Sequence, residues 1–271
     1  MRIITAIIAG VLALSPGLGA QAADTGRDEN GFPRLPPGTP SGYLATSSLP
    51  DSLALLPPPP AADSAAFQRD EDASKDAARA PESPRWRRAA SDADLHFPQA
   101  AQTYACVTGV APSPEATPTL YRLLRRSLVD LGLSTYKAKN HYQRTRPFVA
   151  HGNATCSPGD EAMLRQDGSY PSGHSAVGWG WALLMAEIDP ERADAILQRG
   201  RDYGQSRMVC NVHWQSDVEA GRLVASATVA RLHAEPDFQA DMQAAKAELA
   251  AARQSETAAP SSCDAEAESL R

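Results

Sequence analysis

The strongest constraint on the fold is the spacing of apolar residues between positions 117 and 232, which recur every three or four residues. Almost no stretch shows the alternation of a half-buried strand, so the pattern predicts packed helices. One helix should begin at Thr117-Pro118, an N-cap and first-turn pair, and end at Gly132. Its apolar stripe consists of Leu120, Leu123, Leu124, Leu128 and Leu131.

Three further helices are expected, over residues 172–188, 190–203 and about 217–232. Ser172 suits the N-cap of the first of them. This helix is apolar on most sides, which is typical of a buried central helix. The chain of 271 residues is also long enough for one sizeable core. We therefore predict an all-α fold, a single-domain helical bundle.

The first 22 residues have the pattern of a secretory signal peptide. Arg2 precedes an apolar run from Ile3 to Leu14, and the small-x-small sequence Ala20-Gln21-Ala22 follows. The run is too short to span a bilayer, which disfavours a membrane anchor. We expect cleavage after Ala22 and a periplasmic or secreted protein.

The flanks of the helical region differ from it in composition. Residues 23–41 are rich in Pro and Gly, which predicts an extended leader. The segment 250–271 is rich in Ala, Glu and Ser and has few large apolar groups, which predicts a loose tail. The folded domain is expected over residues 42–249.

Composition and cysteine content narrow the environment and the partners. The formal net charge is −6 and aromatic residues make up 6% of the chain, which disfavours binding to a nucleic-acid polymer. Beyond the signal peptide no apolar stretch approaches the roughly 18 residues of a membrane span. An exported chain with four cysteines suggests disulfides, and their three pairings stay open at this point.

Three short blocks place polar residues within the apolar pattern. Lys139 is followed by Arg146-Pro147, residues 169–174 read SYPSGH, and the third block contains Ser206-Arg207, His213 and Asp217. Lys139 and Arg146 are two helical turns apart, so both can lie on one helix face. Pro147 disfavours a helical conformation at Arg146, whose side chain should then swing freely at a helix end.

The second and third blocks predict an anion site with two histidines. Ser172 and Gly173 open a helix whose N–H groups can hold an anion, and His174 stands in its first turn. His213 and Asp217 are four residues apart, so the carboxylate can reach the imidazole and fix its tautomer. Arg207 adds a third cation. The set suits a tetrahedral oxyanion, and phosphoryl transfer through histidine is the matching chemistry.

The three blocks resemble, position for position, the motif of the type 2 phosphatidic acid phosphatase and vanadium haloperoxidase superfamily. Residues 168–174 and 213–217 are similar to bacterial class A non-specific acid phosphatases, as are 139–148 and the leucine-rich segment before the four prolines 57–60. The resemblance spans roughly residues 42–249. It implies the all-α bundle of that superfamily and an acid phosphatase with broad specificity for phosphate monoesters.

The resemblance also implies a role for each matching residue. His213 would be the nucleophile that forms a phosphohistidine, Asp217 would orient it, and His174 would be the general acid. The phosphate oxygens would be held by Lys139, Arg146, Ser172, Gly173 and Arg207. A disulfide between Cys156 and Cys210 is implied as well, which leaves Cys106 and Cys263 either free or paired with each other.

Five other functions would use part of the same residues. A metal hydrolase could take its ligands from the second and third blocks, but three cations aimed at one point would repel a divalent ion. A serine hydrolase built on Ser172 lacks the G-x-S-x-G elbow. A vanadium haloperoxidase would hold vanadate in the same site, and the class A-like flanks favour the phosphatase. A phosphate-binding protein would have no use for His213 and Asp217, and a membrane lipid phosphatase needs transmembrane helices.

The expected partners follow from this interpretation. They are small-molecule phosphate monoesters, with inorganic phosphate and vanadate as inhibitors, and other alcohols could accept the phosphoryl group. No nucleic-acid polymer or membrane partner is expected, and a homo-oligomer is compatible with the sequence. The enzyme should need no metal and no other cofactor.

Overall fold

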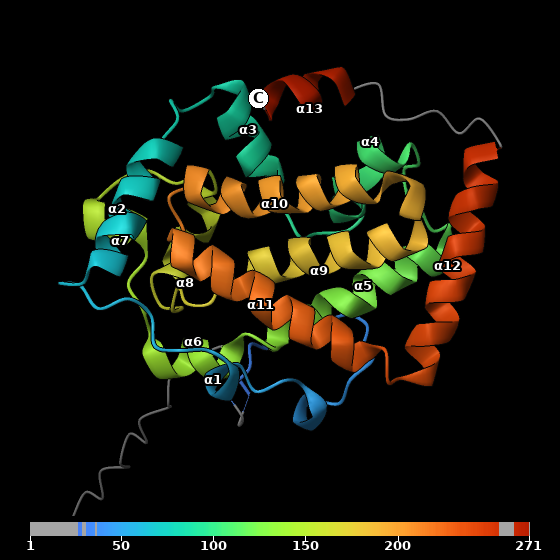
Figure 1. Cartoon of the computed structure of the whole chain (residues 1–271), viewed down its shortest axis with the longest axis horizontal. Coiled ribbons are helices and arrows are strands. Elements are labelled where there is room, and N and C mark those ends of the chain that lie inside the picture. The colour runs from blue at the N-terminus through green and yellow to red at the C-terminus, as the bar shows by residue number, and fades with distance from the viewer. Residues whose placement is uncertain (1–26, 29–30, 36, 255–262, 271) are drawn as a thin grey trace, which may run out of the picture.

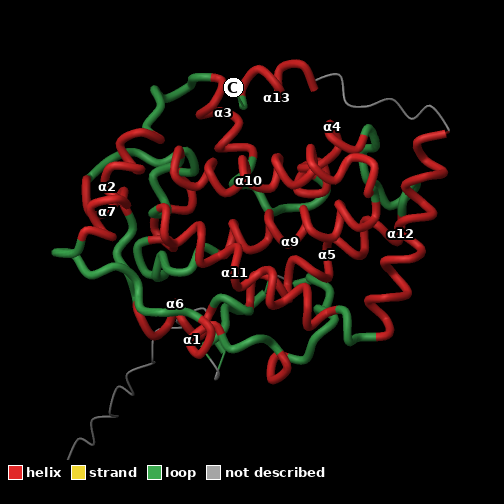
Figure 2. Tube along the Cα trace, viewed as in Figure 1, coloured by secondary structure: helices red, strands yellow, loops and turns green. Residues whose placement is uncertain are grey.

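The computed structural model describes residues 27–28, 31–35, 37–254 and 263–270, so the expected signal peptide and its cleavage site lie outside them. In these ranges one isolated bridge between Arg27 and Pro33 is the only β pairing, and helices form the rest of the regular structure (Figures 1 and 2). The predicted all-α class is confirmed. None of the helices described is long and apolar enough to cross a membrane.

Long helices run side by side through the bundle, the longest helix described, Pro236–Gln254, stands across one end of it, and shorter helices lie around its sides (Figure 1). Their bounds are α1 Ser52–Leu55, α2 Ala65–Ala77, α3 Pro84–Ser91, α4 Ala105–Thr108, α5 Pro118–Leu133, α6 Tyr136–Tyr142, α7 Pro147–His151, α8 Glu161–Leu164, α9 Gly173–Ile188, α10 Ala193–Val209, α11 Gln215–Leu232, α12 Pro236–Gln254 and α13 Cys263–Ser269.

Helix α9 lies at the centre of the bundle, between α10 and α11 and against α5 (Figure 1). Buried side chains surround most of its circumference, as the apolar sequence predicts. Two glycines allow the neighbours to come close: a Cβ at Gly178 would clash with the Tyr203 ring of α10, and one at Gly180 with Leu131 of α5. The N-terminus of α9, which carries the second polar block, is therefore held on a rigid element.

The start of α9 follows the sequence-based expectation. Ser172 precedes the helix in extended conformation, and its Oγ accepts a hydrogen bond from the Ser175 N–H at 3.2 Å. The predicted N-cap is confirmed. Helices α10 and α11 are longer than expected, because α10 continues to Val209 and α11 already begins at Gln215.

The start of α5 is capped by a different residue from the one predicted. The helix begins at Pro118, but the Thr117 hydroxyl donates to the Ser113 carbonyl and does not cap the helix. The cap comes from α12, where the Glu248 carboxylate accepts hydrogen bonds from the N–H groups of Thr119 and Leu120 at 2.8 and 3.0 Å. Glu248 lies more than 120 residues away along the chain from the helix start, so no local sequence pattern could predict this cap.

The described parts of the expected tail are helical over residues 250–254 and 263–269. Helix α12 continues to Gln254, and α13 packs on α3. A disulfide between Cys106 and Cys263 fixes the start of α13, and Glu266 accepts from Arg88 and Arg199 at 2.8 and 3.0 Å. The expectation of a loose tail is therefore wrong for these two helices. Helix α13 needs few large apolar residues because the disulfide and the two contacts of Glu266 hold it.

The α5 cap generates a stability prediction. Replacement of Glu248 by Ala removes the acceptor of two N–H groups, so the free energy of unfolding should fall by about 1 kcal/mol in urea denaturation. Lys246→Ala, at an exposed position of the same helix, is the matched control and should change it by less than about 0.5 kcal/mol. Equal effects of the two substitutions would contradict the capping role.

Candidate active site

The first polar block joins the end of one helix to the start of another. Helix α6 ends at Tyr142, and Gln143 follows in the left-handed conformation with φ 44°. Arg146 is the extended residue before α7. Lys139 and Arg146 therefore do not share one helix face, and that prediction is wrong. They meet because the left-handed residue redirects the chain.

Arg146 is also fixed in place rather than free to swing. The residue is 2% exposed. Its guanidinium donates hydrogen bonds to the carbonyl oxygens of Leu164, Asp167 and Val212 at 2.9, 3.0 and 3.0 Å. These backbone acceptors, from the end of α8 and from the loops that contain Asp167 and Val212, orient the group before any substrate binds.

A carboxylate that was not predicted from the sequence joins the two cations. Asp167 Oδ2 lies 3.5 Å from Lys139 Nζ and 3.2 Å from Arg146 Nη2. Lys139 also donates to the Gly168 carbonyl at 2.7 Å. Burial lowers the pKa of Lys139 to about 8, and the charge of Asp167 opposes that shift. The lysine therefore stays mostly charged at neutral and acid pH.

The second block lies beside the first at the N-terminus of α9. The Ser172 N–H donates to the Asp217 carbonyl at 2.9 Å, which joins the second block to the third. A Cβ at Gly173 would lie 3.8 Å from Lys139 Cε, so the lysine side chain passes the bare backbone at this position. His174 Nε2 lies 3.0 Å from the Ala93 carbonyl oxygen. Because a carbonyl oxygen only accepts hydrogen bonds, Nε2 carries a proton, and Nδ1 is the ring nitrogen that remains for proton transfer.

The third block brings His213 and Asp217 together at the start of α11. His213 Nδ1 lies 3.4 Å from Asp217 Oδ2, and its Nε2 lies 3.1 Å from Arg146 Nη1. A guanidinium can only donate, so Nε2 is the acceptor and the neutral ring holds its proton on Nδ1, facing Asp217. The contact expected from the four-residue spacing is present, although His213 itself precedes the helix.

Arg207 supplies the third cation from α10. It is 1% exposed, and among the described residues it has no carboxylate partner. Its Nη1 lies 3.8 Å from Cys210 Sγ, and its Nε has no hydrogen-bond partner within the described ranges. Burial lowers the pKa of Arg207 to about 10, so the buried group still carries its charge at neutral pH.

Both imidazoles lie where a positive charge is costly. The pKa of His174 is held well below 6.5, mainly by burial and next by the charge of Arg207. Burial, followed by the charges of Arg146 and Lys139, holds the pKa of His213 well below 6.5 as well. The fold places the predicted residues near one another, as their contacts and the effect of Arg207 on both imidazoles indicate: Lys139, Arg146, Ser172, Gly173, His174, Arg207, His213 and Asp217.

Two further buried residues orient Asp217 and were missed from the sequence. Arg144 Nη1 lies 2.6 Å from Asp217 Oδ1, and its Nη2 lies 2.7 Å from Asp70 Oδ2 on α2. Asp70 Oδ1 accepts from the Ser216 N–H at 2.8 Å in the first turn of α11. Asp70 belongs to a charged stretch typical of a solvated face, so only its place in the fold reveals this contact.

A disulfide lies next to Arg207 of the site. Cys156 in the loop after α7 is joined to Cys210 at the end of α10. This is the pairing that the resemblance implies, and it is confirmed. The remaining pair, Cys106 and Cys263, is bonded too, which settles the alternative left open. The cross-link ties the loop after the first block to the helix that carries Arg207.

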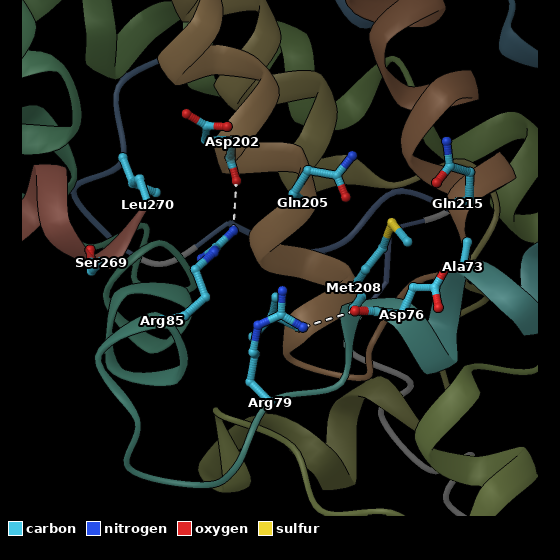
Figure 3. A pocket seen from close by; sticks show the side chains of 12 residues that line it. Ala73, Asp76, Arg79, Arg85, Asp202, Gln205, Met208, Gln215, Ser269 and Leu270 are labelled. Atoms are coloured by element: carbon cyan, nitrogen blue, oxygen red, sulfur yellow. Dashed lines mark hydrogen bonds between the residues drawn. The ribbon is translucent and has the colours of Figure 1, made fainter.

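A separate pocket lies between α2, α3, α10 and α13 (Figure 3). It has a volume of about 370 Å³, and Arg79, Arg85 and Asp202 are among its lining residues. The pocket touches the site only indirectly, since Arg85 donates to the Ser206 hydroxyl at 2.9 Å. Within the described ranges no three His, Cys, Asp or Glu side chains gather as a metal-binding group.

Comparisons with known proteins agree with this geometry. Residues 123–237 match the PAP2 superfamily. A non-specific acid phosphatase of Providencia stuartii is 45% identical over 77% of this chain and 84% of its own length. One of Salmonella typhimurium is 44% identical over 73% of this chain and 80% of its own length, and an acid phosphatase of Zymomonas mobilis is 41% identical over 76% and 78%. The chain thus belongs to the PAP2 superfamily and, within it, to the bacterial class A non-specific acid phosphatases.

Proposed function

We propose that this chain is an exported acid phosphatase that hydrolyses a broad range of phosphate monoesters through a phosphohistidine on His213. Family membership and the names of the relatives support phosphatase activity. The intermediate, the export and the breadth of substrates are the further content of the proposal. Export rests on the signal-peptide pattern of residues 1–22.

The observation that carries the proposal is a buried Arg207 without a carboxylate partner among the described residues, beside two imidazoles. Buried charges are normally paired, so this guanidinium favours an anionic ligand. Lys139 and Arg146 approach the same histidine and add two more charges. Three cations match the charge and the several oxygens of a phosphoryl group.

In the first step the Nε2 lone pair of His213 attacks phosphorus, and the bond from phosphorus to the ester oxygen breaks. The ring proton on Nδ1 faces Asp217, which stabilises the positive charge that develops on the imidazole. Protonated His174 gives its Nδ1 proton to the leaving oxygen, so an alcohol departs. Arg146 must release Nε2 for this attack, and the incoming phosphate oxygens replace that contact.

In the second step water attacks the phosphohistidine, and the phosphorus–nitrogen bond breaks. His174, now neutral, accepts the proton of the water and is ready for the next cycle. Inorganic phosphate and neutral His213 are the products. An alcohol in place of water would receive the phosphoryl group, so phosphate transfer belongs to the same mechanism.

The proposed mechanism predicts that the nucleophile is indispensable to turnover but not to phosphate binding. His213→Ala should lower kcat for an aryl phosphate by at least about 10³-fold. Inorganic phosphate should still bind, because the three cations remain. His233→Ala, at the far end of the same helix, is the control and should keep its activity. A His213→Ala enzyme with ordinary turnover would exclude the phosphohistidine on this residue.

The two histidines predict an acid pH optimum. Turnover needs neutral His213, so activity is lost as the pH falls through its pKa. It also needs protonated His174, so activity is lost as the pH rises through that pKa. Both pKa values lie below 6.5 in the free protein. The profile of kcat/KM should therefore be bell-shaped with its maximum below about 6.5, and a maximum on the alkaline side would contradict the assignment.

Metal independence is the third prediction from this site. Lys139, Arg146 and Arg207 supply the charge that a metal ion would otherwise provide, and they would repel a divalent cation at the same point. Hydrolysis of an aryl phosphate should keep its rate after dialysis against a chelator. A loss of activity that Mg²⁺ or Zn²⁺ restores would assign the reaction to metal catalysis instead.

A further inference from the structure

Asp167 is shared between the site and the N-terminal leader. Its Oδ1 accepts a hydrogen bond from Arg27 Nη2 at 2.8 Å. Its Oδ2 faces Lys139 and Arg146 at 3.5 and 3.2 Å. The side chain of Asp167 is 10% exposed and that of Arg27 24%, so water screens this ion pair only in part. A residue outside the expected catalytic domain thus contacts the carboxylate that faces two site cations.

The part of the leader that carries Arg27 is docked on α6, the helix of Lys139. The Arg27 guanidinium lies 5.2 Å from the centre of the Tyr136 ring, and buried Phe32 packs 6.5 Å from the same ring. Asn140 donates to the Gly31 carbonyl at 2.9 Å, and Arg27 donates to that same oxygen. These contacts give Arg27 a defined position beside Asp167.

We propose that Arg27 is a positioning residue of the phosphate site: by neutralising Asp167, it leaves Lys139 and Arg146 available to a phosphoryl group. This inference rests on the proposed function. An unpaired Asp167 would compete with phosphate for the same N–H donors and would repel its negative charge. The N-terminal leader then contributes a residue that tunes phosphate binding and is not only a spacer after the signal peptide.

Two observations support the competition between Asp167 and phosphate. Asp167 Oδ2 already occupies one N–H donor of Arg146, at 3.2 Å from Nη2, and lies 3.5 Å from Lys139 Nζ. Although burial alone would raise the pKa of Asp167, the charges of Lys139, Arg146 and Arg27 hold it below its usual range. These charges therefore favour the anionic form of Asp167, which is the form that competes with phosphate.

A double-mutant cycle between Arg27 and Asp167 tests this role. The readouts are the Kd of inorganic phosphate by calorimetry, which needs no turnover, and kcat and KM for an aryl phosphate. Arg27→Ala should weaken phosphate binding and raise KM by about 3- to 10-fold, with kcat within about 2-fold. Asp167→Asn should tighten phosphate binding. In the Asp167→Asn background the effect of Arg27→Ala should fall below about 2-fold.

Two further variants separate the role of charge from packing. Arg27→Lys keeps the charge and should retain most of the phosphate affinity. Arg122→Ala breaks a more exposed arginine–aspartate pair with Asp241, where α5 meets α12, and should leave the Kd unchanged. Circular dichroism shows whether the Asp167→Asn variant folds. If it does not, the comparison of Arg27→Lys with Arg27→Ala decides the question, and equal losses of phosphate affinity in these two variants overturn the inference.

The outcomes also distinguish this inference from the proposed function. An equal loss of phosphate affinity by Arg27→Ala in both backgrounds would mean that Arg27 acts through packing alone and would overturn the proposal. No loss in either background would overturn it as well. A wild-type protein that binds phosphate but hydrolyses no monoester would refute the proposed function, while the binding measurements would still decide the role of Arg27.

Discussion

The burial of three cations beside two imidazoles is the constraint on which the rest of the site depends. Lys139, Arg146 and Arg207 are each at most 3% exposed, and charges so deeply buried destabilise a fold unless something compensates them. Asp167 compensates the first two, whereas Arg207 has no carboxylate partner in the described part of the chain. Burial of the site, and next to it the charges of these cations, lowers the pKa of both histidines. Affinity for an anion and the acid pH optimum proposed here thus both depend on positive charge buried beside the imidazoles.

The fold maintains this arrangement by joining the N-termini of two helices. The Ser172 N–H donates to the Asp217 carbonyl, so α9 and α11 meet where the second and third blocks lie. Gly221 permits this approach, since a Cβ there would clash with the Ser172 carbonyl. Arg144 holds Asp217 from the other side with help from Asp70, so Asp217 has a fixed orientation toward His213. Asp217 is well supported because Arg144, which contacts it, is itself held by Asp70.

Much of the site could be predicted from the sequence, because its residues stand in short blocks with meaningful spacing. The cap of α9 and the contact between His213 and Asp217 are local, and both are present. The prediction that Lys139 and Arg146 share one helix face is wrong, because Gln143 adopts the left-handed conformation and the helix ends between them.

Partners far apart in the chain were missed for another reason. Arg27 and Asp167 are 140 positions apart, and Glu248 lies more than 120 positions from the helix start it caps. Each of them, taken alone, resembles an ordinary surface charge. The packing of α13 was not predicted for a similar reason, since it depends on a disulfide whose pairing the sequence left open.

The most direct test of the account is to find where the phosphoryl group resides during turnover. The protein would be mixed with an aryl phosphate, quenched within milliseconds in alkali, where phosphohistidine survives, and digested for peptide mass spectrometry. The account predicts a phosphate on the peptide that contains His213, lost on acid treatment and absent when Asn replaces the histidine. A phosphate on any other residue, or rapid turnover with no phosphorylated peptide at all, would contradict it.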